Sequence, residues 1–178
     1  TAAKLGTNSV DGTKIAMGSD AAGDLLYHGA SDYTRLAKGT SSQVLIMNAG
    51  ATAPEWATTV TKVILKDYGE TTNAIGGTGG GTQDIDLELG NSVSATVDTS
   101  TNTFTFSNPT ASDEGCGFTL VLTNGGSQTV NWPSSVDWAG GTAPSLTASG
   151  VDILTFWSID GGTIWHGMAA STDTKSPA

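Results

Sequence analysis

The stretch Asp84–Ile85–Asp86–Leu87–Glu88–Leu89 alternates acidic with aliphatic side chains without a break. Successive side chains of a β-strand point to opposite faces of a sheet. The pattern therefore predicts a strand whose aliphatic residues enter a core while Asp84, Asp86 and Glu88 face water. A fold built from such strands is mostly β.

The same period of two continues through the rest of the chain. Apolar side chains recur at alternate positions in three further stretches: Val93–Val97, Phe104–Phe106 and Phe118–Leu122. Val151–Ile159 is apolar on both faces, which is typical of a central strand. Asp160–Gly162 suits a turn and predicts a hairpin with the residues up to His166. We predict an antiparallel β-sandwich, jelly-roll-like, over residues 84–170.

Residues 1–57 consist of short apolar units separated by glycine, each too small to bury a core. Leu25–His28 and Tyr33–Ala37 flank turn-forming residues and predict a hairpin, and Gln43–Asn48 predicts a further strand. Ordering such a segment costs about 1–2 kcal/mol of backbone entropy per residue. Its sparse apolar side chains offset this cost only if identical chains bury them together. A flexible linker is the alternative.

Residues 58–83 connect these two parts, and residues 171–178 form a flexible tail. Val60–Tyr68 predicts an apolar strand or a helical turn, so the first strand of the sandwich can begin near residue 62. Ile75–Gly81 predicts a flexible loop. It lacks the Gly-Lys-Ser/Thr sequence of a phosphate-binding loop.

The charge of the chain excludes two kinds of partner. Seven basic residues stand against 17 acidic ones, and residues 61–178 hold twelve of the acidic side chains against three basic ones. Nucleic acids and anionic membranes are bound chiefly through Lys and Arg. We therefore expect no nucleic-acid partner and no membrane insertion, and we expect a carbohydrate partner to be neutral or to be reached through a bound cation.

Catalytic and metal-binding motifs are sparse. No serine lies in a Gly-x-Ser-x-Gly sequence, the single Cys116 fits a small buried side chain, and His28 and His166 lie far apart in the sequence. Asp84 and Asp86 leave open a calcium site, although two carboxylates supply too few of the six or more oxygens that calcium needs. We predict a protein that is not an enzyme and binds no cofactor.

The tryptophans divide into two groups. Trp132, Trp157 and Trp165 lie in strand patterns and fit the core or a subunit interface. Trp138 follows Asp137 in a segment that we expect to be a loop. An indole can stack on a sugar ring while a neighbouring carboxylate accepts hydrogen bonds from the hydroxyls of the sugar. Trp138 and Asp137 are therefore the predicted receptor or carbohydrate contact.

Several stretches together resemble the terminal β-domain of phage tail-fibre and related virion proteins. They are Phe104–Pro109, Phe118–Thr123, Val130–Val136, Gly141–Pro144, Val151–Phe156 and Asp160–Gly167. Upstream, Gly23–Tyr27, Arg35–Thr40, Gln43–Leu45 and Ala53–Trp56 resemble a module found in phage fibres just before the tip. From first to last they span residues 23–167, about four-fifths of the chain, and their joint order carries the resemblance.

The resemblance implies a homotrimeric structural protein of the virion. Residues 1–57 would be a fibre segment, joined to other tail or capsid proteins, and the sandwich would be a tip that contacts a host-surface glycan or protein during adsorption. Such a protein is assembled in the host cytoplasm and located in the virion. A head fibre or decoration protein anchored on the capsid is the alternative, and a polysaccharide depolymerase is a more distant one.

Overall fold

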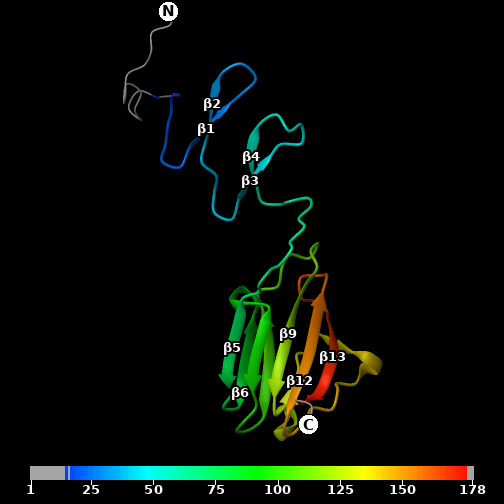
Figure 1. Ribbon diagram of the computed structural model, residues 1–178. Helices are drawn as coiled ribbons and strands as arrows, with labels where there is room; N and C mark the ends of the chain where they lie inside the picture. The colour runs from blue at the N-terminus through cyan, green and yellow to red at the C-terminus, as the bar shows by residue number, and fades with distance from the viewer. Residues whose placement is uncertain (1–14, 16, 176–178) are drawn as a thin grey trace, which may run out of the picture. The chain divides into compact units, whose positions relative to one another are not determined.

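The computed structural model describes residue 15 and residues 17–175. These residues form a mostly β structure, with thirteen strands and three 3-10 helices of three residues each. The chain divides into two compact units, with the boundary in the sequence between Lys66 and Asp67. Both units are built from β-strands and the segments that connect them (Figure 1).

The N-terminal unit contains two antiparallel hairpins. In the first, β1 (Leu25–His28) pairs with β2 (Tyr33–Leu36), as the sequence predicts. In the second, β3 (Val44–Met47) pairs with β4 (Pro54–Ala57). The strand β3 was predicted, whereas β4 was not, because its Pro54 and Glu55 are poor strand formers. As the first residue of β4, Pro54 does not interrupt the pairing.

Side-chain hydrogen bonds fix the loops around these hairpins. The Asp24 carboxylate accepts hydrogen bonds from Arg35 Nη1 at 2.7 Å, from the Lys38 amide at 2.8 Å and from the Ala21 amide at 2.7 Å. These contacts, the Arg35 bond foremost, lower the pKa of Asp24 to about 2. Trp56 Nε1 donates to the Ala37 carbonyl at 2.8 Å, which ties the second hairpin to the end of the first.

The N-terminal unit has no core of its own among its described residues. No side chain of residue 15 or of residues 17–66 is buried. Val60–Tyr68, predicted as a strand or helical turn, is neither, and the side chain of Ile64 is 82% exposed. That prediction was wrong because the apolar run finds no strand or core to pair with within either unit.

The C-terminal unit contains two sheets. The larger has the strand order β11-β13-β12-β9-β7-β5 and the smaller the order β10-β8-β6. The bounds of the larger sheet's strands are β5 Thr72–Gly77, β7 Ser92–Thr96, β9 Cys116–Thr123, β11 Val136–Trp138, β12 Val151–Ser158 and β13 Trp165–Thr174. Those of the smaller sheet are β6 Gly81–Asp86, β8 Asn102–Ser107 and β10 Val130–Asn131.

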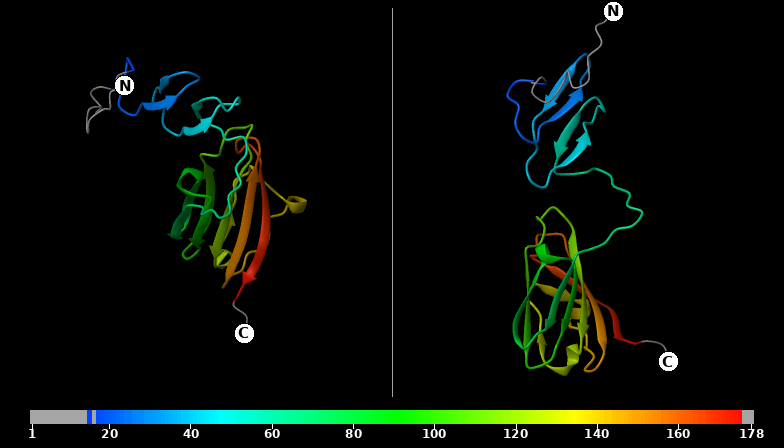
Figure 2. Two further views of the ribbon diagram at one scale, coloured as in Figure 1. Left: turned by 45° about the horizontal axis from the view of Figure 1, so that its top comes forward. Right: turned by 60° about the vertical axis from the view of Figure 1, so that its left-hand side comes forward.

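The chain passes from one sheet to the other between successive strands from β5 to β11. Each crossing reverses the chain direction, so strands two apart in sequence run the same way and pair in parallel. Five of the seven strand pairs in this unit are parallel, and only β12 pairs antiparallel, with β9 and with β13. The predicted antiparallel, jelly-roll-like arrangement was therefore wrong. Figure 2 shows β12 and β13, in orange and red, as the long antiparallel pair.

The core between the two sheets confirms the predicted alternation in most strands. Buried side chains include Val93, Ala95 and Val97 on β7 and its end, Phe104 on β8, Phe118, Leu120 and Leu122 on β9, and Cys116. Aromatic rings dominate one part of this core. The ring of Phe118 stacks on Phe156 with centroids 4.7 Å apart and meets Phe106 edge-on at 4.9 Å.

Two stretches near the opening pattern differ from the prediction. The alternation ends at Asp86, because its carboxylate accepts the Glu88 amide at 2.9 Å and starts a 3-10 helix over Leu87–Leu89. Glu88 therefore leaves the strand, and Leu89 is exposed. Of the predicted glycine-rich loop, residues 75–77 belong to β5 and Gly81 begins β6, since glycine still supplies the backbone hydrogen bonds that pair strands.

Asp152 is fully buried within β12, the strand that the sequence predicts to be apolar on both faces. Its carboxylate accepts hydrogen bonds from the amide and hydroxyl of Thr147, at 2.6 and 2.7 Å, and from the Asp173 amide at 3.0 Å. Burial by itself raises the pKa of Asp152, but these hydrogen bonds outweigh burial and hold the pKa below its ordinary value. The carboxylate thus joins the loop before β12 to the end of β13.

Replacing Asp152 by asparagine is expected to destabilise the C-terminal unit by about 1–3 kcal/mol at neutral pH, because an amide cannot accept all three hydrogen bonds. Since the folded pKa is lowered, the ionised carboxylate stabilises the fold at neutral pH. This stabilisation is lost as the pH falls through the acidic range in which the carboxyl becomes protonated. Urea unfolding at several pH values should show a shallower acid loss for Asp152→Asn than for the parent. Equal slopes would contradict the assignment.

Candidate functional site

The structure separates the two side chains of the predicted receptor contact. Asp137 and Trp138 lie on strand β11, not in a loop, so their side chains point to opposite faces of the larger sheet. Trp138 packs inward, with ring centroids 5.5 Å from both Trp132 and Phe156. The two residues therefore cannot stack on and hydrogen-bond to one sugar ring together.

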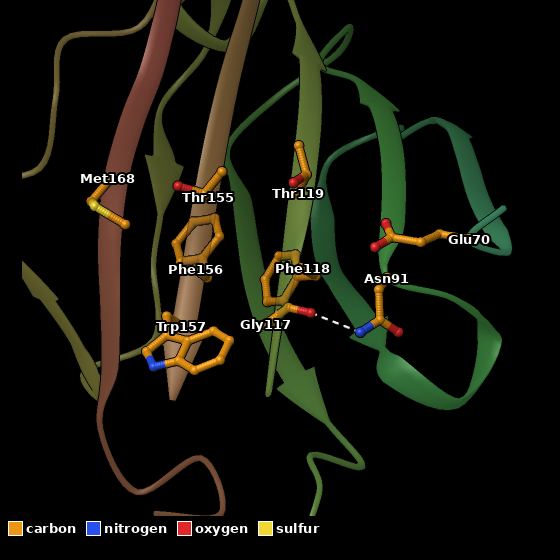
Figure 3. A pocket seen from close by; sticks show the side chains of 9 residues that line it. All are labelled: Glu70, Asn91, Gly117, Phe118, Thr119, Thr155, Phe156, Trp157 and Met168. Atoms are coloured by element: carbon orange, nitrogen blue, oxygen red, sulfur yellow. Dashed lines mark hydrogen bonds between the residues drawn. The ribbon is translucent and has the colours of Figure 1, made fainter. Parts of the chain in front are cut away.

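A groove of about 320 Å³ lies on the outer face of the larger sheet, across β9, β12 and β13. It is lined by Glu70, Asn91, Gly117, Phe118, Thr119, Thr155, Phe156, Trp157 and Met168. Figure 3 shows the indole of Trp157 reaching from β12 toward Gly117, with Met168 to one side and with Glu70 and Asn91 to the other. The volume of the groove lies at the lower end of the range of small-molecule binding sites.

Trp157 is the exposed aromatic of this groove. On β12 the residues Asp152, Leu154, Phe156 and Ser158 face the core, so Trp157 faces outward, and it is 47% exposed. Its indole lies close to the backbone at the start of the neighbouring strand β9. A Cβ added to Gly115 would lie 2.6 Å from the ring, and one added to Gly117 would lie 3.0 Å from it. The two glycines therefore make room for the indole against the sheet.

The strand register places two further side chains in line with Trp157, across β13 and β11. Trp157 is paired with His166 on β13, and His166 is paired with Asp137 on β11. Paired residues share a face, and both His166 and Asp137 are exposed. Asp137, His166 and Trp157 thus form a row across the outer face. Asp137 therefore lies on the same face as Trp157, whereas Trp138 lies on the opposite face.

Polar groups surround the indole on the side of β9. Asn91 Nδ2 donates to the Gly117 carbonyl at 2.7 Å, which fixes the amide at the edge of the groove. Thr119 and Thr155 are paired across β9 and β12 and are partly exposed, and Glu70 is exposed. An aromatic plane bordered by hydroxyl, amide and carboxylate groups can bind a small ligand that has both an apolar face and hydroxyls.

The predicted calcium residues are engaged elsewhere. The Asp84 carboxylate accepts hydrogen bonds from Thr105 Oγ1 at 2.6 Å and Ser107 Oγ at 2.5 Å. Asp86 Oδ1 accepts one from Asn108 Nδ2 at 2.8 Å. Both carboxylates thereby fasten β6 to β8 and the residue after it. Within residue 15 and residues 17–175, no three His, Cys, Asp or Glu side chains are grouped as a metal site would need.

The sequence missed Trp157 as a site residue. Trp165 is buried and Trp132 packs against the core, as predicted for the strand tryptophans, but Trp157 does not join the core. The nearest signal in the sequence is Gly115-x-Gly117, a pair of glycines beside an apolar strand. The glycine pair can be related to Trp157 only once the register of β9 and β12 is known, because that register pairs Gly117 with Trp157.

Comparison with known proteins adds no relative: no family model matches the chain, and neither the curated proteins nor the solved structures give a significant match. Among the residues that the structure describes, no helix has the length and apolar character needed to cross a membrane.

Proposed function

We propose that the chain is a structural fibre protein of a virion, assembled as a homotrimer, whose C-terminal unit is the exposed tip that contacts the host surface. The observation that carries the proposal is the contrast between the two units. Residues 67–178 bury a complete aromatic and aliphatic core, whereas the described part of residues 1–66 buries no side chain. The resemblance of both parts to phage fibre modules supports the same assignment.

The N-terminal unit needs neighbours to be stable. An isolated two-stranded hairpin is at best marginally stable in water, because neither of its faces is covered. Both hairpins here have large apolar side chains in contact with solvent. They are Leu25, Leu26, Tyr33, Val44, Leu45 and Met47, and the segment that follows adds Val60, Val63, Ile64 and Leu65. Winding together with identical chains buries these side chains, which stabilises the assembly by about 25 cal/mol for each Å² removed from water.

The C-terminal unit suits an exposed position. It buries an aromatic and aliphatic core of its own, and it holds twelve acidic side chains against one basic side chain, Lys175. Such a surface stays soluble and avoids nucleic acid and anionic lipid. Its outer sheet face also carries the Trp157 groove, which supplies a surface for a host ligand.

We expect purified full-length protein to block adsorption of the particles that carry it. The protein occupies the same host-surface sites as the particles, so adsorption should fall as its concentration rises. The control is the chain truncated after Lys66, which should leave adsorption unchanged. Adsorption that remains complete at saturating full-length protein would contradict a role for the C-terminal unit in host contact.

A further inference from the structure

We propose that the Trp157 groove binds a neutral pyranose sugar, with one face of the sugar ring stacked on the indole. This inference rests on the proposed function, because it names the ligand of the same exposed unit. Nothing in the sequence motifs assigns the site, since the predicted contact was Trp138 with Asp137, which the structure separates.

The first step of the argument is the shape of the aromatic surface. Gly115 and Gly117 let the indole lie against the sheet, so one face of the ring is supported and 47% of the residue remains exposed. Large aromatic side chains in a protein of this size are normally buried or paired. The other tryptophans of the C-terminal unit contact the aromatic core, whereas no ring stacks on Trp157 among the described residues.

The second step is the chemistry around the indole. A pyranose has an apolar face of C–H groups and a rim of hydroxyls. Trp157 and Met168 supply an apolar floor, and Thr119, Thr155, Asn91 and Glu70 supply hydrogen-bonding groups at its border. A ligand that is apolar throughout would leave these polar groups without partners, which costs binding energy.

The third step is charge. Glu70 lines the groove, and Asp137 lies in the row of Trp157 and His166. With twelve acidic side chains and one basic one, the unit repels sialic acids, sulfated sugars and phosphorylated sugars. The sugar is therefore neutral, and its binding should change little with salt concentration.

A second copy of the chain fits this part of the sheet less well. The row next to Trp157 consists of Met168, Thr155, Thr119, Ser92 and Thr72, so four of its five members carry hydroxyls. Stable interfaces have apolar, well-packed centres and bury at least about 1,000 Å². A single exposed indole beside hydroxyl side chains is better suited to bind a small ligand than to pack against a second copy of the chain.

The test uses the full-length protein on an array of neutral, sialylated and sulfated oligosaccharides, followed by calorimetric titration with the best neutral ligand at low and high salt. We expect binding to neutral members only, at least a tenfold loss of affinity in Trp157→Ala, and a smaller loss in the paired change Thr119→Val with Thr155→Val. The matched control is Ile159→Ala, which removes an apolar side chain that is 61% exposed and lies outside the groove. It should bind as the parent does.

Three results would overturn the inference: no neutral ligand on the array, equal affinity in Trp157→Ala, or a changed molecular mass of Trp157→Ala by light scattering, which would make the groove a subunit contact. Thermal unfolding shows whether each variant is folded. If Trp157→Ala does not fold, the paired change Thr119→Val with Thr155→Val tests the site, because valine has the same shape as threonine. The adsorption experiment reports on the proposed function separately. Protein that blocks adsorption but binds no neutral sugar would refute only the present inference.

Discussion

Replacing Leu45 by aspartate is expected to convert the assembled protein into monomers. Leu45 is 45% exposed within one chain and is paired with Trp56 across the second hairpin. In a monomer such a surface change alters stability by no more than about 0.5 kcal/mol. In an assembly that buries this hairpin, each copy would place an unpaired carboxylate in the interface, which costs several kcal/mol per charge. Light scattering should show the loss of mass directly.

The matched control for this variant is Ile159→Asp. Ile159 is at least as exposed as Leu45 but lies between β12 and β13 in the C-terminal unit. It should keep the mass of the parent. A Leu45→Asp protein that remains assembled would show that the second hairpin is not in the interface. Circular dichroism distinguishes dissociation from unfolding, because the core of residues 67–178 is expected to stay intact in the monomer.

Replacing Phe118 by alanine is expected to destabilise the C-terminal unit by about 3–5 kcal/mol. The side chain is buried in the core, stacked on Phe156 and packed edge-on against Phe106 and Trp165, with centroid distances of 4.7, 4.9 and 5.6 Å. Its removal leaves a cavity that three rigid rings cannot fill. The loss is a large share of the 5–15 kcal/mol typical of a folded domain, and urea unfolding followed by tryptophan fluorescence measures it.

Thr123→Ala on the same strand provides the comparison. Thr123 lies at the end of β9 on the face opposite to Phe118, Leu120 and Leu122, and is partly exposed. Its replacement should cost less than about 1 kcal/mol. Equal losses in the two variants would mean that the alternation along β9 does not separate core from surface.

The strands of the core could be predicted from the sequence because the local alternation of apolar and polar residues indicates both the strand and its buried face. Phe118, Leu120 and Leu122 alternate with glycine, threonine and valine, and only one face of such a strand can be buried on this sheet. The direction of pairing could not be predicted. A short polar connection between two strands has the same composition whether it forms a hairpin within one sheet or crosses to the other. The crossing, which makes most pairs parallel, is decided by packing between distant strands.

The site shows the same limit. Val151–Ile159 was apolar on both faces, so the sequence could not tell that Asp152 faces inward and Trp157 outward. The inward position of Asp152 depends on hydrogen bonds from Thr147 and Asp173, the second of which is 21 residues away. Asp137 and Trp138 were grouped because they are adjacent in sequence, which on a strand places them on opposite faces. The charge-based expectation of a neutral ligand, by contrast, needed no geometry and now forms part of the proposal for Trp157.

The central claim is that the N-terminal unit folds in company with its copies. The most direct test is the molecular mass of the whole wild-type chain, measured by light scattering across a wide range of concentrations. The account predicts a mass near three times the 18.0 kDa of one chain, kept on dilution. A well-folded monomer of 18.0 kDa throughout the range would contradict it.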